Sequence, residues 1–353
     1  MRLTKYYIFS EEISAGQKDY SISFARLIAT IFIFLCHFFQ YYCNGLTYFF
    51  NVAVQMFFFL SGLLYANRKI EDPIAFLKKG AKKILVPYYI YVVIACIIGR
   101  IFIPEDCTWH IVVKLLLLDA EGSYTALNNL WFISHILFCY LMAPLFLKWI
   151  TYIEEHKGLL YYMMIFCTLL GILVFFYKYA SYYKPWDTLC YFIGILYGRL
   201  AMRKENVLIA IWNIILVGGT LLLKGFLKFT DQHMDYIYAH DLAGLQYQLY
   251  KMSHAFMGIT FVIICVFIYK VIFQSKSNRL VEIFLGWSDK YSYFIYLTHQ
   301  IFMLGAFSLC AYIVSKKVAM LVILACTLIA AWCLQRMSQV LLGWMRTVEL
   351  KRE

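Results

Sequence analysis

Apolar runs of about 18 or more residues recur along the whole chain, and a helix needs ~20 such residues to cross the ~30 Å hydrocarbon core of a bilayer. Hydrophobic residues make up 63% of the 353 residues and charged residues only 15%, which is more apolar material than one soluble core can bury. The alternating pattern of a membrane β-barrel is absent from the sequence, so the spans are expected to be helices. The predicted fold class is therefore all-α, a polytopic membrane protein with about ten transmembrane helices. We expect the spans over residues 21–43, 48–66, 84–103, 129–147, 159–178, 188–202, 206–223, 253–273, 291–311 and 318–343.

The basic residues indicate how the chain is oriented. With a cytoplasmic N-terminus, most of the 32 Lys and Arg residues fall in the inner segments, and an excess of basic residues in cytoplasmic loops sets the topology. We therefore expect both termini to be cytoplasmic and the protein to be a multi-pass protein of the plasma (inner) membrane. Residues 1–20, which lack the apolar core of a signal peptide, are expected to form a cytoplasmic N-terminal segment, 21–343 a single transmembrane domain and 344–353 a cytoplasmic tail. Topology accounts for the net charge of +12, so no nucleic acid partner is expected.

The cysteines and the polar loops suggest neither disulfides nor a metal. All of the eleven cysteines except Cys107 fall in apolar runs, where they are expected to act as small hydrophobic residues. The stretch 230–241 contains three aspartates and two histidines, but their spacing matches no standard ligand set. We expect no metal and no permanently bound cofactor.

Two polar side chains, Arg26 and His37, stand in the first apolar run. The eleven residues from one to the other bring both side chains to within ~20° of one helix face, ~16 Å apart along the axis. An ionisable group at membrane depth usually faces a protein interior or a water-filled cavity. Each residue also has a structural interpretation, because Arg26 can extend to the membrane surface and His37 can bond to a neighbouring backbone. As a pair they suit an extended ligand with phosphates at one end and its reactive atom at the other.

Four further stretches follow the Arg-x10-His pair: NVAVQMFFFLSGLLY at 51–65, FLKKGAKKILVPYY at 76–89, NNLWFISHILFCYL at 128–141 and SYFIYLTHQIF at 292–302. In this order, over nearly the whole chain, the five signatures resemble those of the acyltransferase-3 family of bacterial membrane acyltransferases. The resemblance implies transfer of an acyl group, usually acetyl from acetyl-CoA, to a hydroxyl of a cell-surface glycan. It also implies that His37 is the essential histidine and Arg26 its basic partner. The chain is similar to the stand-alone members, which have no soluble hydrolase-like domain at the C-terminus.

The chain departs from the family pattern after the second span. The family commonly has an Arg-x-x-Arg pair there, whereas the basic residues of this chain are Lys78, Lys79, Lys82 and Lys83. Lys79 and Lys82 have the same spacing, and a lysine offers a point charge to phosphate without the two-pronged guanidinium. We expect Lys79, Lys82 and Lys83, with Arg26, to bind the phosphates of the acyl-CoA donor. Positive-inside topology and contact with anionic lipids predict the same lysine cluster.

Acyl transfer from a thioester to a hydroxyl needs a group that takes the hydroxyl proton, and a neutral imidazole does this. His37 is therefore predicted to be either the general base or a nucleophile that carries the acyl group itself, and the sequence leaves both open. No Asp or Glu lies in the middle of a predicted span to orient its ring. The expected partners are the outer-loop acids Asp119 or Glu121, or Asn44, which lies seven residues on along the same face.

Four residues are candidates for contacts with the acceptor or the oxyanion: Asn44, Trp131, Ser292 and His299. His299 lies seven residues after Ser292, near one helix face, and either helps to bind the acceptor and stabilise the oxyanion or forms a hydrogen bond between helices. Trp131 has two interpretations. It either stacks on a sugar ring of the acceptor or belongs to the belt of aromatic residues at the membrane interface. His135 and His254 have no partner at a telling spacing and are interpreted as structural.

The predicted function is a membrane-bound O-acyltransferase that moves an acetyl group from cytoplasmic acetyl-CoA to a hydroxyl of an exopolysaccharide, capsule or lipid-linked glycan. The expected partners are acyl-CoA, the glycan acceptor and the lipid bilayer. The alternative is a glycan or lipid-linked oligosaccharide transporter (a flippase), in which the intramembrane pair lines the transport path. A glycan polymerase also accounts for many spans and Tyr-rich outer loops, but it gives no reason for the Arg-x10-His pair.

Overall fold

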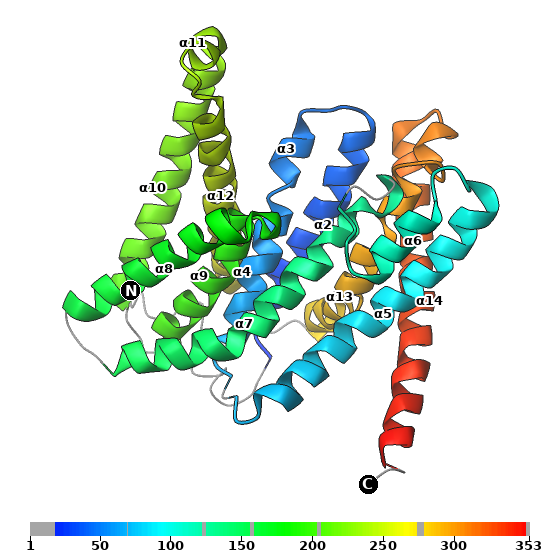
Figure 1. The fold of residues 1–353 in the computed structure, drawn as a ribbon, viewed down its shortest axis with the longest axis horizontal. Coiled ribbons are helices and arrows are strands. Elements are labelled where there is room, and N and C mark those ends of the chain that lie inside the picture. Colours follow the sequence, from blue (N-terminus) through cyan, green and yellow to red (C-terminus); the bar gives the residue numbers. More distant parts are fainter. Residues whose placement is uncertain are drawn as a thin grey trace. The chain divides into compact units, whose positions relative to one another are not determined.

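The computed structural model describes residues 18–68, 70–121, 125–155, 159–202, 206–273 and 279–350. Within these residues every regular element is a helix (Figure 1). Most of the predicted N-terminal segment, residues 1–20, lies outside them. The elements are α2 (Tyr20–Tyr41), α3 (Leu46–Phe50), α4 (Ala53–Tyr65), α5 (Pro73–Phe102), α6 (Trp109–Leu116), η2 (Thr125–Leu130), α7 (Trp131–Glu154), α8 (Leu159–Tyr179), η3 (Ser181–Tyr183), α9 (Pro185–Met202), α10 (Asn206–Asp231), α11 (Met234–Ala239), α12 (Ala243–Ile272), α13 (Arg279–Thr298), η4 (Gln300–Phe302), η5 (Leu309–Ala311) and α14 (Lys316–Leu350).

The prediction of an all-helical polytopic membrane protein is confirmed. Three of the ten predicted spans coincide with α8, with α9, which has 18 residues, and with α13, which carries four charged residues. Helix α14 continues through most of the predicted tail at 344–353. Among the described residues, the 7 helical stretches long and apolar enough to cross a membrane are Tyr20–Tyr41, Leu46–Tyr65, Pro73–Phe102, Thr125–Glu154, Ile209–Asp231, Ala243–Ile272 and Lys316–Val348.

The predicted bounds of the ninth span, 291–311, are wrong. Helix α13 begins at Arg279 and ends at Thr298, and its four charged residues, the last of which is Lys290, conceal it in the hydropathy pattern. The apolar residues after Thr298 form the short helices η4 and η5, with a turn at Gly305 between them. Gly305 has a φ of +82°, and a Cβ there would lie 3.2 Å from the backbone nitrogen of Ala126, so only glycine fits at little cost. The apolar composition of this stretch therefore reflects burial rather than a continuous membrane span.

The chain folds into two compact units. Of the described residues, the first unit takes those within 1–29, 52–69 and 143–286, and the second takes those within 30–51, 70–142 and 287–353. Helices α2, α7 and α13 each contribute residues to both units. The predicted transmembrane domain at 21–343 therefore comprises two units built from interleaved segments.

Close backbone contact between α4 and α9 characterises the first unit. A Cβ added to Gly62 on α4 would collide with the carbonyl group of Tyr191 on α9, and small residues that let two backbones approach are typical of helix packing in membranes. A buried hydrogen bond of 2.6 Å from Gln55 Nε2 to Asp187 Oδ1 joins the same two helices. Helices α10 and α12 run side by side, with α11 at their shared end (Figure 1).

The second unit contains all of the predicted site residues except Arg26. Helices α5 and α14 pack against each other, and Tyr88 on α5 donates a hydrogen bond of 2.6 Å to a carbonyl at the end of α6. The last turns of α2 pack through Phe34 and Phe38 against the apolar segment after α13 and the first turns of α14. This packing places the turn of α2 that carries His37 beside the segment that begins at His299.

Candidate active site

His37 lies near the end of α2, where its side chain is partly buried. Its Nδ1 atom is 2.8 Å from Oε1 of Gln40, one turn further along the helix. An amide oxygen only accepts hydrogen bonds, so Nδ1 of His37 donates and carries the ring proton. The neutral ring therefore presents Nε2 as its basic nitrogen. Gln40 orients the imidazole and sets its tautomer.

The partners expected for His37 from the sequence have other contacts. Helix α2 ends at Tyr41, so the expectation that Asn44 extends its face is wrong. The Asn44 side chain instead accepts a hydrogen bond of 2.9 Å from the backbone nitrogen of Leu46, in the turn before α3. Lys114 forms an ion pair of 3.3 Å with Asp119 and donates a hydrogen bond of 2.9 Å to the carbonyl of Glu121. The signal that identifies Gln40 is its i,i+3 spacing from His37, which places two side chains side by side on a helix.

His299 is the second histidine of the site. Its ring centroid is 5.1 Å from that of His37, and its side chain is fully buried. Its Nδ1 atom lies 3.1 Å from the carbonyl oxygen of Ile295 and 2.8 Å from that of Tyr296, so Nδ1 carries the proton. Nε2 is buried and has no hydrogen-bond partner among the described residues. In the neutral ring this atom is a hydrogen-bond acceptor, which argues against the expected role of His299 as a donor to an oxyanion.

Hydrogen bonds join the sequence signature at 128–141 to the one at 292–302. The carbonyl of Tyr296 accepts a hydrogen bond of 2.9 Å from Asn129 Nδ2, and the Tyr296 hydroxyl donates to the carbonyl of Asn129. The side chain of Gln300 donates to the carbonyl of Thr125. The Tyr296 carbonyl thus accepts hydrogen bonds from both Asn129 Nδ2 and His299 Nδ1. These bonds fix the segment before α7 against the segment that carries His299.

The part of α5 that carries the lysines is hydrogen-bonded to α13, the helix that precedes His299. The Tyr293 hydroxyl donates a hydrogen bond of 2.8 Å to the carbonyl of Ile84, which directly follows Lys83. Tyr293 precedes His299 by six residues, ~9 Å along a helical path. The side chains of Lys79 and Lys83 are exposed and that of Lys82 is partly buried. The lysines therefore belong to the unit that contains the two histidines.

Trp131 and Ser292 are positioned by contacts within their own helices. The Trp131 ring is partly buried and meets the His135 ring edge-on, with the centroids 4.8 Å apart at 81°. His135 Nδ1 lies 2.7 Å from the Trp131 carbonyl, one turn back along α7. The buried Ser292 hydroxyl donates to the carbonyl of Asp289 at 3.3 Å. Contact of either residue with the acceptor stays a prediction.

Arg26 lies on the part of α2 that belongs to the first unit, and its side chain is partly buried. Its predicted role in donor binding, like that of the lysines, stays a prediction. In the part of the chain that the structure describes, no three His, Cys, Asp or Glu side chains are grouped so that they could hold a metal ion.

The helices define the class of the protein as a multi-pass membrane protein. Residues 19–336 match the family model described as "Acyltransferase domain", the acyltransferase-3 model. Since the match covers nearly the whole chain and both units, the chain belongs to this family of acyltransferases, and the resemblance found from its sequence signatures is confirmed. Searches of curated proteins and of solved structures found no match.

Proposed function

We propose that the protein moves an acetyl group from cytoplasmic acetyl-CoA to a hydroxyl of a cell-surface or lipid-linked glycan, such as an exopolysaccharide or a capsule. The observation that supports this most is the pair of imidazole rings of His37 and His299, 5.1 Å apart. The pair lies in the second unit, where His37 of the first sequence signature meets the fifth, and where hydrogen bonds join the fifth signature to the third and the fourth. Membership of an acyltransferase family favours this function over a transporter of glycans or lipids.

His37 acts as the general base in this proposal. Its Nε2 atom takes the proton of the acceptor hydroxyl while the hydroxyl oxygen attacks the carbonyl carbon of the thioester. The new C–O bond forms, the carbonyl oxygen becomes an oxyanion, and its collapse breaks the C–S bond. The proton then passes from His37 to the leaving thiolate of CoA. Gln40 holds the required tautomer, and Nε2 of His299 accepts a hydrogen bond from the bound substrate.

The same residue allows a second route, in which Nε2 of His37 attacks the thioester, the C–S bond breaks and CoA leaves with the ring proton. The glycan hydroxyl then attacks the acetyl-imidazole, the N–C bond breaks, and the hydroxyl proton returns to the imidazole. The two routes differ when the acceptor is withheld. A relay accumulates acetyl-imidazole on His37 in the presence of acetyl-CoA alone, whereas a general base does not. Rapid quenching followed by mass spectrometry of the intact protein measures this difference.

The lysine cluster of α5 is proposed to bind the phosphates of the donor. Replacing Lys79, Lys82 and Lys83 together by Gln should raise the KM for acetyl-CoA about thirtyfold, the equivalent of roughly 2 kcal/mol of charge-assisted hydrogen bonding. The kcat should change little, because these contacts are the same in the ground and transition states. The measurement is the rate of CoA release against acetyl-CoA concentration.

Two comparisons make the lysine experiment specific. The wild-type preference for acetyl-CoA over its 3′-dephospho form should shrink in the triple variant, since a lost phosphate contact affects only the phosphorylated donor. The matched control replaces Lys316 and Lys317, at the start of α14, by Gln, and should leave the KM unchanged. If the KM for acetyl-CoA is unaltered in the triple variant, the lysines do not bind the donor. They would then serve only to orient the chain in the membrane and to contact anionic lipids.

The function itself is tested on the surface glycan of the host cell. Mass spectrometry with and without the protein should show polymer of equal length that carries an acetyl ester only when the protein is present. The reason is that a transferase modifies the polymer, whereas loss of a transporter stops its export. Polymer that vanishes with the protein, or that carries the same esters without it, would reject the proposed function.

A further inference from the structure

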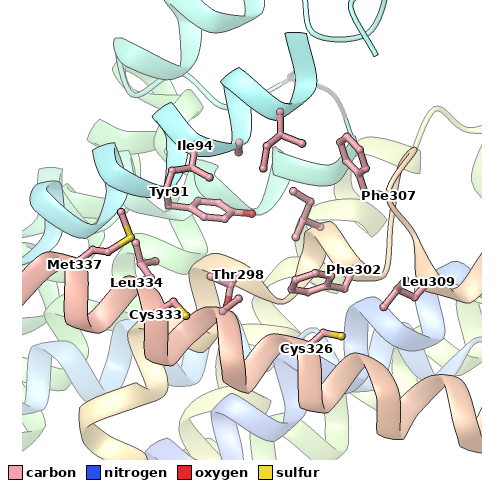
Figure 2. A pocket seen from close by; sticks show the side chains of 14 residues that line it. Tyr91, Ile94, Thr298, Phe302, Phe307, Leu309, Cys326, Cys333, Leu334 and Met337 are labelled. Atoms are coloured by element: carbon pink, nitrogen blue, oxygen red, sulfur yellow. The ribbon is translucent and has the colours of Figure 1, made fainter. Parts of the chain in front are cut away.

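The second unit contains an apolar cavity of about 520 Å³ between α5, α14 and the segment after α13 (Figure 2). Small side chains leave this space, because Ala95 on α5 and Cys326 and Ala330 on α14 line it. Hydroxyl groups are contributed by Tyr91 and Thr298, and no lining residue is charged among those the structure describes. Protein interiors are otherwise close-packed, and this volume lies within the range of ligand pockets, roughly 300–1,000 Å³. Hydrocarbon fits such a cavity better than water.

The inner wall of the cavity is the segment that carries His299. Thr298 directly precedes His299 and Phe302 follows it closely, and both line the cavity (Figure 2). The Thr298 hydroxyl lies 3.4 Å from the carbonyl of Thr327, which ties this segment to α14. The imidazole of His299 meets that of His37. One short stretch of backbone therefore lies between the cavity and the two histidines.

The outer end of the cavity opens on a surface that faces lipid. Ile94 on α5 and Met337 on α14 line the cavity and are 38% and 46% exposed. Ile97 on α5 and Trp332 on α14 are exposed apolar residues as well. Both helices contain membrane-spanning stretches, so this surface meets the hydrocarbon of the bilayer. A hydrocarbon chain can therefore enter the cavity sideways from the membrane.

We propose that this cavity binds the hydrocarbon tail of the lipid that carries the glycan acceptor. The inference rests on the proposed function and specifies its substrate class, a lipid-linked rather than a free glycan. The uncharged lining excludes the phosphates of CoA, and an acetyl group is too small to fill the space. A tail held beside His299 keeps the attached glycan close to the two histidines, which raises its effective concentration at the site.

Photo-crosslinking tests the cavity without reference to activity. The full-length protein in lipid nanodiscs is irradiated with farnesyl phosphate that carries a diazirine at the end of its tail. We expect labelled peptides from α5, from α14 and from residues 298–309. Replacing Ala330 by Phe narrows the cavity and should displace two methylene groups of the bound tail. Each buried methylene group contributes about fourfold to the affinity, so the labelling should fall about fifteenfold.

Two further variants keep the experiment decisive. Cys333→Trp blocks the exposed mouth of the cavity and replaces Ala330→Phe if that variant does not fold. Ile329→Phe is the matched control, because Ile329 is adjacent to Ala330 on α14 and is 63% exposed. Its labelling should equal that of the wild type. In acetylation assays, Ala330→Phe should raise the KM for a farnesyl-linked glycan and leave the KM for the free oligosaccharide unchanged.

The outcomes separate the tail site from the function. Equal labelling of these peptides by diazirine-bearing phosphatidylcholine would show that the cavity holds bulk lipid and would overturn the proposal. No labelling, or equal labelling of wild type and Ala330→Phe, would overturn it too. Selective labelling by the farnesyl probe in a protein that acetylates no glycan would support the tail site and reject the proposed acetyl transfer.

Discussion

Replacing His37 by Gln should lower the kcat of acetyl transfer about 10³-fold in a protein that still folds and inserts. General acid–base catalysis contributes ~10²–10⁴-fold, and the amide of Gln cannot take a proton from the acceptor and return it to the leaving thiolate. Folding should survive, because His37 is only partly buried and its side-chain hydrogen bond is to Gln40, on its own helix. The measurement is the initial rate of CoA release together with the acetyl content of the glycan, at equal amounts of inserted protein.

The matched control for this variant is His240→Gln. His240 is exposed at the end of α11, and its Nδ1 lies 2.9 Å from the carbonyl of Tyr236 one turn back, so the same substitution there should leave the rate unchanged. A His37→Gln protein that kept more than about a tenth of the wild-type kcat would lie outside the range for a lost general base. That result would contradict the assignment of His37.

The membrane helices are predictable, and His37 is recognisable as a candidate, because both depend on local properties of the sequence. An apolar run long enough to span lipid has to satisfy its backbone within a helix, and an ionisable residue inside such a run is exceptional whatever surrounds it. Gln40 is not predictable in the same way, since an amide one turn from a histidine is also an ordinary surface residue. The expectation for Asn44 fails because the sequence does not reveal that α2 ends at Tyr41.

The association of the two histidines depends on contacts between distant parts of the chain. The sequence shows the order of the signatures, but only the structure shows that Asn129 bonds to Tyr296 and that Tyr293 bonds to Ile84. The cavity is hidden for the same reason. Ala330 is one of several small residues on α14, and its place beside a void follows from the packing of α14 against α5.

Replacing His299 by Asn should lower kcat about 10²-fold, and replacing it by Gln should lower kcat much less. The amide nitrogen of Asn takes the position of Nδ1 and keeps a donor for the carbonyls of Ile295 and Tyr296, but nothing remains at the position of Nε2. The longer Gln side chain places its amide oxygen near that position and so retains an acceptor. Loss of this acceptor leaves a buried hydroxyl of the substrate without a partner, which costs ~1–3 kcal/mol, or up to about 10²-fold in rate, and this sets the expected effect of the Asn variant.

A purely architectural role for His299 predicts the reverse order, because the bonds to Ile295 and Tyr296 are the ones that hold the segment in place. Stability and activity therefore have to be measured together, as the Tm of each variant in detergent and its kcat and KM for the acceptor. We expect the Asn variant to be the more stable and the less active of the two. An Asn variant more active than the Gln variant would contradict a role for Nε2, and His299 would then serve to position His37 through packing alone.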